Sequence, residues 1–173
     1  MRPSLLLCAF LATSALAVSP VPRPVPPLEI VDSGGRHTVS SYKGKVVVVQ
    51  FLLTDCIHCQ AFSQLLSACQ AQYGPRGFQA LGGAVNDVTA EKLRDYSAQY
   101  AIGFPVGPIP RDPMLGFLGL SPMDRLSFPQ IAVIDRKGQI REQTTIDTSV
   151  RQPLQEEAHL RALIEKLLAE SAR

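Results

Sequence analysis

Two cysteines three residues apart carry the clearest chemical signal in this 173-residue sequence. Cys56 and Cys59 frame a Cys-Ile-His-Cys motif that is separated by two residues from the end of the valine-rich run 45–53. Such a run predicts a strand buried on both faces, and apolar residues at helical spacing predict a helix over 61–73. Cys56 is therefore expected at an exposed helix N-terminus, where free N–H groups and the helix dipole stabilise a thiolate, with Cys59 one turn further on. This arrangement suits a dithiol that opens and closes a disulfide.

Haem sites, zinc sites and structural disulfides also use paired cysteines, but they fit this chain less well. A c-type haem site requires histidine after the second cysteine, where this chain has Gln60. Structural zinc requires four ligands, and Cys69, His37 and His159 stand at no suitable spacing. A purely structural disulfide stays open, although it would close a loop too short to remove much entropy from the unfolded chain. We therefore predict neither a metal site nor a cofactor beyond the dithiol itself.

Composition indicates one ordinary domain. The sequence is 46% hydrophobic, which is enough for a sizeable core, and its formal charge of +2 comes from scattered basic residues. Nothing in that distribution points to nucleic acid. Four cysteines are too few for a disulfide-built scaffold.

The N-terminus has the pattern of an export signal. A basic start at Arg2 precedes the apolar run 5–18, and Ala15-Leu16-Ala17 has the small-x-small form of a signal peptidase site. The run is shorter than the roughly 20 residues of a membrane span. We predict a signal peptide over 1–17 and a periplasmic or otherwise extracytoplasmic location, with an uncleaved membrane anchor as the alternative. The proline-rich stretch 18–27 is predicted to be a stiff, solvated spacer that forms neither strand nor helix.

The domain is then expected over 28–173, as an α/β fold with a parallel core. Cys69 belongs to the apolar stripe of the first helix and is interpreted as a core residue. The predicted elements are a hairpin at 28–39, a strand at 45–53, a helix at 61–73, a strand at 78–85, a helix at 90–101 capped by Thr89, helical turns at 114–120, a hairpin at 128–146 and a helix after Pro153.

A Cys-x-x-Cys motif after a buried strand, with Pro129 opening a hairpin about seventy residues later, resembles the thioredoxin superfamily. The segment 39–45, which leads into the valine run, is similar to the exported AhpC/TSA and TlpA-like branch. The resemblance implies a three-layer α/β/α sandwich around a mixed sheet. It also implies that Cys56 is the attacking thiolate, that Cys59 is the resolving thiol, and that a cis Pro129 faces them.

Further site residues follow from the same resemblance. The backbone of Phe128 is expected to pair with a bound peptide, and Asp55 and Ile57, which flank Cys56, are expected to contact substrate. Asp55 stands where thioredoxins usually have tryptophan, and its carboxylate should disfavour a neighbouring thiolate. His58 lies between the cysteines and should favour a thiolate. Because these two effects oppose each other, the sequence leaves the redox direction open.

Two rival functions remain. Peroxiredoxins carry a proline and a threonine before their reactive cysteine, and here Val48 and Leu52 occupy those positions. A copper chaperone could hold Cu(I) with the two thiolates, but such proteins generally add a distal histidine, and His159 is interpreted as a surface residue. The sequence favours an exported thiol-disulfide oxidoreductase that acts on cysteine-containing exported proteins. An unidentified partner, which could be membrane-bound, must recycle it.

Overall fold

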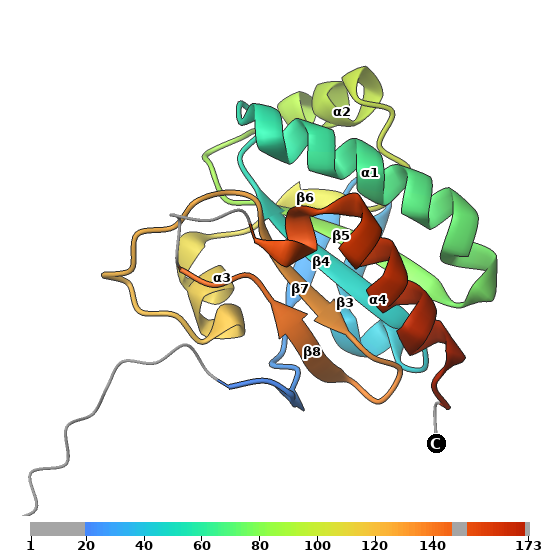
Figure 1. Ribbon diagram of the computed structural model, residues 1–173. Helices are drawn as coiled ribbons and strands as arrows, with labels where there is room; N and C mark the ends of the chain where they lie inside the picture. The colour runs from blue at the N-terminus through green and yellow to red at the C-terminus, as the bar shows by residue number, and fades with distance from the viewer. Residues whose placement is uncertain (1–19, 147–151, 172–173) are drawn as a thin grey trace, which may run out of the picture.

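The computed structural model describes residues 20–146 and 152–171, so the predicted signal peptide lies outside the described residues. A six-stranded sheet runs in the order β1-β8-β7-β4-β5-β6, and β2 and β3 form a separate hairpin (Figure 1). The strands are β1 Arg23–Pro24, β2 Glu29–Asp32, β3 Gly35–Thr38, β4 Val46–Leu52, β5 Phe78–Ala84, β6 Val106–Pro108, β7 Gln130–Ile134 and β8 Gln139–Gln143.

Strand β4 occupies the middle of the sheet, as its valine-rich sequence predicts. All seven of its residues are buried. It pairs in parallel with β5 and antiparallel with β7, so both of its edges are hydrogen-bonded. The sheet is therefore mixed. The polypeptide passes from the carboxyl end of β4 through a short loop into the cysteine motif.

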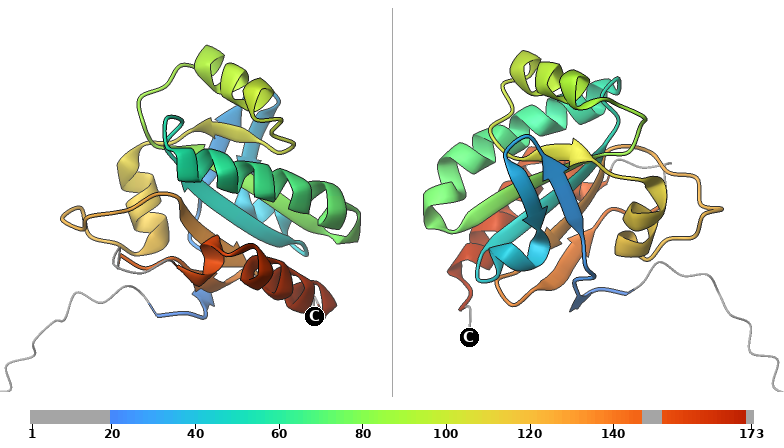
Figure 2. Two further views of the ribbon diagram at one scale, coloured as in Figure 1. Left: turned by 45° about the horizontal axis from the view of Figure 1, so that its top comes forward. Right: turned by 180° about the vertical axis from the view of Figure 1, so that it is seen from behind.

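Helices cover both faces of this sheet (Figure 2). One face packs against α1 Ile57–Tyr73 and α4 Glu157–Ala169, with α2 Ala90–Gln99 beside them. The other face is covered by α3 Arg111–Leu118, the β2–β3 hairpin and a 3-10 helix at Val39–Tyr42. The predicted three-layer α/β/α sandwich is confirmed, although one outer layer has a single short α-helix.

The expectation that the proline-rich stretch pairs with nothing is wrong. Residues Arg23 and Pro24 form β1 on the edge of the sheet, antiparallel to β8. Proline is tolerated on an edge strand because its missing N–H would face away from the ladder. The Arg23 guanidinium donates to the carbonyl oxygen of Phe117 and to Oε1 of Gln143, both at 2.8 Å. This long-range contact docks the segment on the domain and cannot be inferred from local composition.

Smaller differences concern short elements. Strand β6 at Val106–Pro108 was not predicted, because three residues carry too little periodicity. Helix α1 begins at Ile57, earlier than the apolar spacing alone indicated, and β8 ends at Gln143 instead of Ile146. The Thr89 cap is confirmed, since its side chain accepts a hydrogen bond from the backbone N–H of Lys92 at 3.2 Å. Within the described ranges, no helix is long and apolar enough to cross a membrane.

Gly107 of β6 allows the β2–β3 hairpin to approach the sheet closely. A Cβ there would lie far inside contact distance of the backbone carbonyl of Val31. We expect Gly107→Ala to lower the free energy of unfolding by about 1–3 kcal/mol, because the rigid backbone on both sides must shift. Urea unfolding of the reduced protein measures this change.

Gly116 supplies the matched control for that substitution. It is exposed on α3, and a Cβ there would meet nothing within 4 Å. Gly116→Ala should leave the stability unchanged or raise it by up to about 1 kcal/mol, since alanine favours the helix. Equal effects of the two substitutions would contradict the close approach at Gly107.

Candidate active site

The two cysteines occupy different environments at the start of α1. Cys56 is the N-cap residue, with an extended backbone and a half-buried side chain. Cys59 lies one turn into the helix and is 0% exposed. Both are free thiols in this structure, as is Cys69. The predicted placement at the junction of a buried strand and a helix is confirmed.

The predicted partner segment lies against the first cysteine. The Phe128–Pro129 peptide bond is cis, and the Sγ of Cys56 donates to the carbonyl oxygen of Phe128 at 3.8 Å. Phe128 is half-buried, whereas Pro129 is buried. Because the carbonyl of Phe128 faces the reactive sulfur, a peptide bound through the backbone of Phe128 would lie next to Cys56.

Burial gives the Cys59 thiol a different acidity from that of an exposed thiol. It raises the pKa of Cys59 far above the usual value of a thiol, and the neighbouring Cys56 thiol and the Asp55 charge raise it further. A backbone hydrogen bond from Leu53 acts in the opposite direction but is outweighed. Cys59 therefore remains protonated at neutral pH, and Cys56 is the more exposed of the two thiols.

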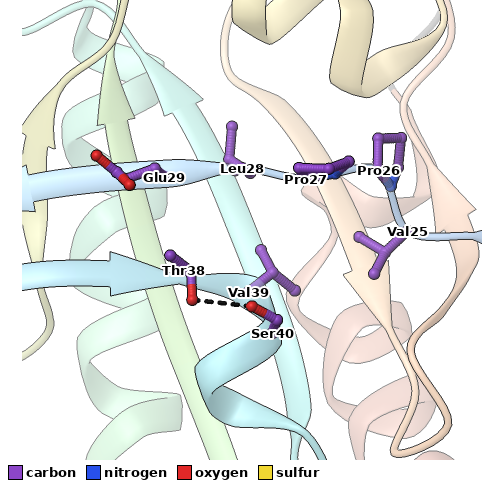
Figure 3. Close-up of a pocket in the computed structure, with 8 residues that line it drawn as sticks. All are labelled: Val25, Pro26, Pro27, Leu28, Glu29, Thr38, Val39 and Ser40. Carbon is purple, nitrogen blue, oxygen red and sulfur yellow. Dashed lines mark hydrogen bonds between the residues drawn. The ribbon is translucent and has the colours of Figure 1, made fainter.

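The residues around Cys56 form an open surface. Asp55 and His58 are exposed, and Ile57 is 72% exposed. His58 therefore faces solvent, although it lies between the two cysteines in the sequence. The pocket in Figure 3, between the proline-rich segment and the start of the 3-10 helix, contains none of the predicted site residues. The side chains of Asp55, Ile57 and His58 therefore lie on an exposed face beside Cys56.

Polar contacts hold the loop before Cys56, and sequence reasoning missed them. The backbone N–H of Thr54 donates to Oδ1 of Asn86 at 3.2 Å, and Nδ2 of Asn86 donates to Oγ1 of Thr54 at 2.9 Å. Nε2 of Gln60 donates to the carbonyl of Thr54 at 2.9 Å. Asn86 follows the end of β5 by two residues, and this position could have indicated the contact. Neighbouring parallel strands end at the same edge of a sheet, so residues that follow β4 and β5 lie close together.

The remaining candidates lie away from the motif. Cys69 is 0% exposed within the core, as predicted. His159 lies on α4 with its side chain 42% exposed, and its Nε2 lies 2.8 Å from Oε1 of Glu142. Among the described residues, no group of three or more histidine, cysteine or acidic side chains could hold a metal ion.

A dithiol at a helix N-terminus after a central strand, facing a cis-proline in a three-layer sandwich, defines a thioredoxin-like protein. The comparisons agree with this class. The model of the AhpC/TSA family matches residues 21–143, and the chain belongs to that family. A search of curated proteins finds no significant match.

Solved structures share the fold. A thiol:disulfide interchange protein of the thioredoxin family from Chlorobium tepidum is 24% identical, with a TM-score of 0.70 over 87% of this chain and 99% of that one. The thioredoxin domain of a thiol-disulfide oxidoreductase from Bacteroides vulgatus is 20% identical, with a TM-score of 0.66 over 89% and 99%. A thiol:disulfide interchange protein from Bacteroides sp. is 18% identical, with a TM-score of 0.66 over 87% and 91%. At these identities the likeness shows the fold.

The contrast between the thiols predicts selective alkylation. In the reduced native protein at neutral pH, iodoacetamide should modify Cys56 at least about tenfold faster than Cys59, because only the thiolate is nucleophilic and Cys59 is both buried and protonated. Peptide mass mapping after short exposures measures the two rates.

A Cys56→Ser variant is the control. Besides Cys8, which lies in the predicted signal peptide, it retains Cys59 and Cys69, and these two buried thiols should resist labelling until urea unfolds the protein. Comparable labelling of Cys56 and Cys59 in the native protein would contradict the assigned environments of the two thiols.

Proposed function

We propose that the protein is an exported thiol-disulfide oxidoreductase that exchanges disulfides with extracytoplasmic proteins through Cys56 and Cys59. The observation that carries the proposal is the contact of the Cys56 thiol with the carbonyl of Phe128, with Cys59 buried behind it. One sulfur is accessible and lies beside a backbone that can bind a peptide. The other is shielded from solvent and can react only with its neighbour.

The exchange proceeds in two displacements. The thiolate of Cys56 attacks one sulfur of a substrate disulfide, which forms a mixed disulfide and releases the other substrate sulfur as a thiol. Cys59 then attacks the Sγ of Cys56, so the mixed disulfide breaks and the second substrate thiol leaves. The substrate gains two electrons and two protons, and the protein is oxidised to the Cys56–Cys59 disulfide. The reverse sequence donates a disulfide to a substrate dithiol.

The surrounding residues take defined parts in this scheme. The backbone of Phe128, whose carbonyl already contacts the Cys56 thiol, aligns the substrate chain during the mixed-disulfide stage. The exposed side chain of Ile57 offers an apolar contact beside the reacting sulfur. Asp55 and His58 adjust the local charge in opposite senses and so set the balance between oxidised and reduced forms.

Export rests on the sequence of residues 1–17, which has the basic start, apolar run and small-residue site of a signal peptide. The names of the related folds fit disulfide exchange, since proteins from Chlorobium tepidum and Bacteroides sp. are called thiol:disulfide interchange proteins. Each turnover leaves this chain in the opposite redox state. A thiol or disulfide partner outside the chain, which could be membrane-bound, therefore has to recycle it.

Peroxide reduction is less well supported. Counted back from Cys56, the peroxiredoxin threonine and proline positions fall on Leu53 and Val49 instead of Leu52 and Val48, and all four of these side chains are apolar. They offer no polar group to position a peroxide beside Cys56.

Substitution of each cysteine tests the assigned roles. Cys56→Ser should abolish disulfide exchange because no attacking sulfur remains, whereas Cys59→Ser should accumulate mixed disulfides that nothing resolves. Insulin reduction and non-reducing gels of protein incubated with disulfide substrates measure both effects. Cys69→Ser is the control and should keep full turnover. Equal residual activity in the Cys56 and Cys59 variants would refute the role assignment.

The reduction potential of the Cys56–Cys59 couple decides the physiological direction. Equilibration with glutathione buffers should give a measurable two-electron couple. A value near the roughly −270 mV of thioredoxin would identify a reductase, and one near the roughly −120 mV of DsbA would identify a disulfide donor. Absence of a couple, together with stoichiometric copper retained on purification, would replace the proposal with metal binding.

A further inference from the structure

A buried chain of polar side chains runs from α2 through α1 to β4 and ends on the backbone of Cys59. Nε2 of Gln50 donates to the carbonyl oxygen of Cys59 at 2.9 Å. The hydroxyl of Ser63 donates to Oε1 of Gln50 at 2.8 Å, and Oγ of Ser63 lies 2.8 Å from Oη of Tyr96. Gln50 and Ser63 are 0% exposed, and Tyr96 is 4% exposed.

The protons in this chain can be ordered in only one way. The carbonyl of Cys59 only accepts, so the NH2 end of the Gln50 amide must face it and Oε1 must face Ser63. Because the single Ser63 proton goes to Oε1, the hydroxyl of Tyr96 must donate to Ser63. Every group is neutral, since burial raises the pKa of Tyr96 to about 12. The chain therefore does not exchange protons with a base at neutral pH.

Protein stability alone does not account for these buried hydrogen bonds. Gln50 is a polar residue in a strand whose other residues are all apolar. Replacing a buried hydrogen-bonded pair by apolar groups of the same shape can be nearly neutral in free energy. These hydrogen bonds instead fix an orientation. They link the first turn of α1 to the central strand at Cys59, the residue that attacks in the second displacement.

We infer that Gln50 is a positioning residue for the resolving step, supported by Ser63 and Tyr96, and that it holds Cys59 in line with the mixed disulfide on Cys56. The inference rests on the proposed function. Under this inference, Gln50, Ser63 and Tyr96 affect the second displacement, by Cys59, and do not affect the first, by Cys56.

The step itself balances without an outside base. The charged or titratable groups that face the Cys59 thiol are Cys56, Asp55 and, on α2, Tyr96. Asp55 is exposed and Tyr96 is held by Ser63. As the Cys59 sulfur bonds to Sγ of Cys56, the bond from that Sγ to the substrate sulfur breaks, and the Cys59 proton passes to the departing substrate thiolate. Such a concerted transfer demands accurate placement of Cys59.

Stopped-flow kinetics with the full mature chain separate the two displacements. A disulfide between two cysteine peptides, one carrying a fluorophore, reports attack by Cys56 as a second-order phase and release of the second peptide as a first-order phase. Gln50→Met keeps the side-chain volume but removes the donor. We expect it to slow the first-order phase by about 10- to 100-fold, because small misplacement of reacting atoms has effects of that order. The second-order phase should change by less than about twofold, since Cys56 keeps its contacts.

Gln143 provides a matched control. It is also a buried strand glutamine, and its Nε2 donates to a helix carbonyl, that of Leu118, at 2.9 Å. Gln143→Met should lose stability in the same way yet leave the first-order phase unchanged. Ser63→Ala should slow that phase less than Gln50→Met, and Tyr96→Phe least, which keeps the test usable if the Gln50 variant fails to fold.

The outcomes separate the two proposals. A wild-type protein with no second-order phase would overturn the proposed function. A wild-type protein with both phases, and a first-order phase that Gln50→Met slows no more than Gln143→Met does, would overturn only the positioning role. If Gln50→Met does not fold, a Ser63→Ala rate equal to that of the wild type would overturn it as well.

Discussion

The burial of β4 is the constraint on which the rest of this structure depends. A strand that is apolar along almost its whole length can be satisfied only in the middle of a sheet, hydrogen-bonded on both edges and covered on both faces. Once it lies there, the chain that leaves its carboxyl end must enter the layer above the sheet. Helix α1 does so at once, and its first turn is therefore fixed relative to the core. The position of Cys56 and Cys59 follows from this packing.

The same packing makes two chemically similar residues unequal. Cys56 is half-buried at the extended N-cap and contacts the carbonyl of Phe128, whereas Cys59 lies inside the first turn of α1 and belongs to the core, where it is 0% exposed. Burial disfavours a thiolate at Cys59 and leaves Cys56 as the more accessible of the two thiols. The second strand of the site, β7, reaches the thiols because it pairs antiparallel with β4 and so begins near the end of it. The sheet thus places both halves of the site.

Sequence reasoning succeeded where local patterns decide the structure. The valine run, the helix stripe and the Thr89 cap each depend on neighbours in the chain, and each is present. It failed for β1, because docking of Arg23 depends on carbonyl and amide oxygens about a hundred residues away in the sequence. It also failed for β6, which has three residues and is a strand only through pairing with β5. For the site, the motif identified the cysteines, but the exposure of His58 and the contacts of Asn86 depend on how distant segments pack.

Gln50 shows most clearly both what a sequence can indicate and where that indication ends. A single glutamine in a run of valines is visible at once, and an isolated polar side chain in a buried strand must find partners or lose free energy. Which partners it finds is a tertiary fact. Here they are the backbone of Cys59 and the hydroxyl of Ser63 on the same helix. If position 50 contributed only to packing, a valine or leucine would serve there. Because a fully paired buried network is more directional than apolar packing, its place beside Cys59 supports the positioning role that we infer for Gln50.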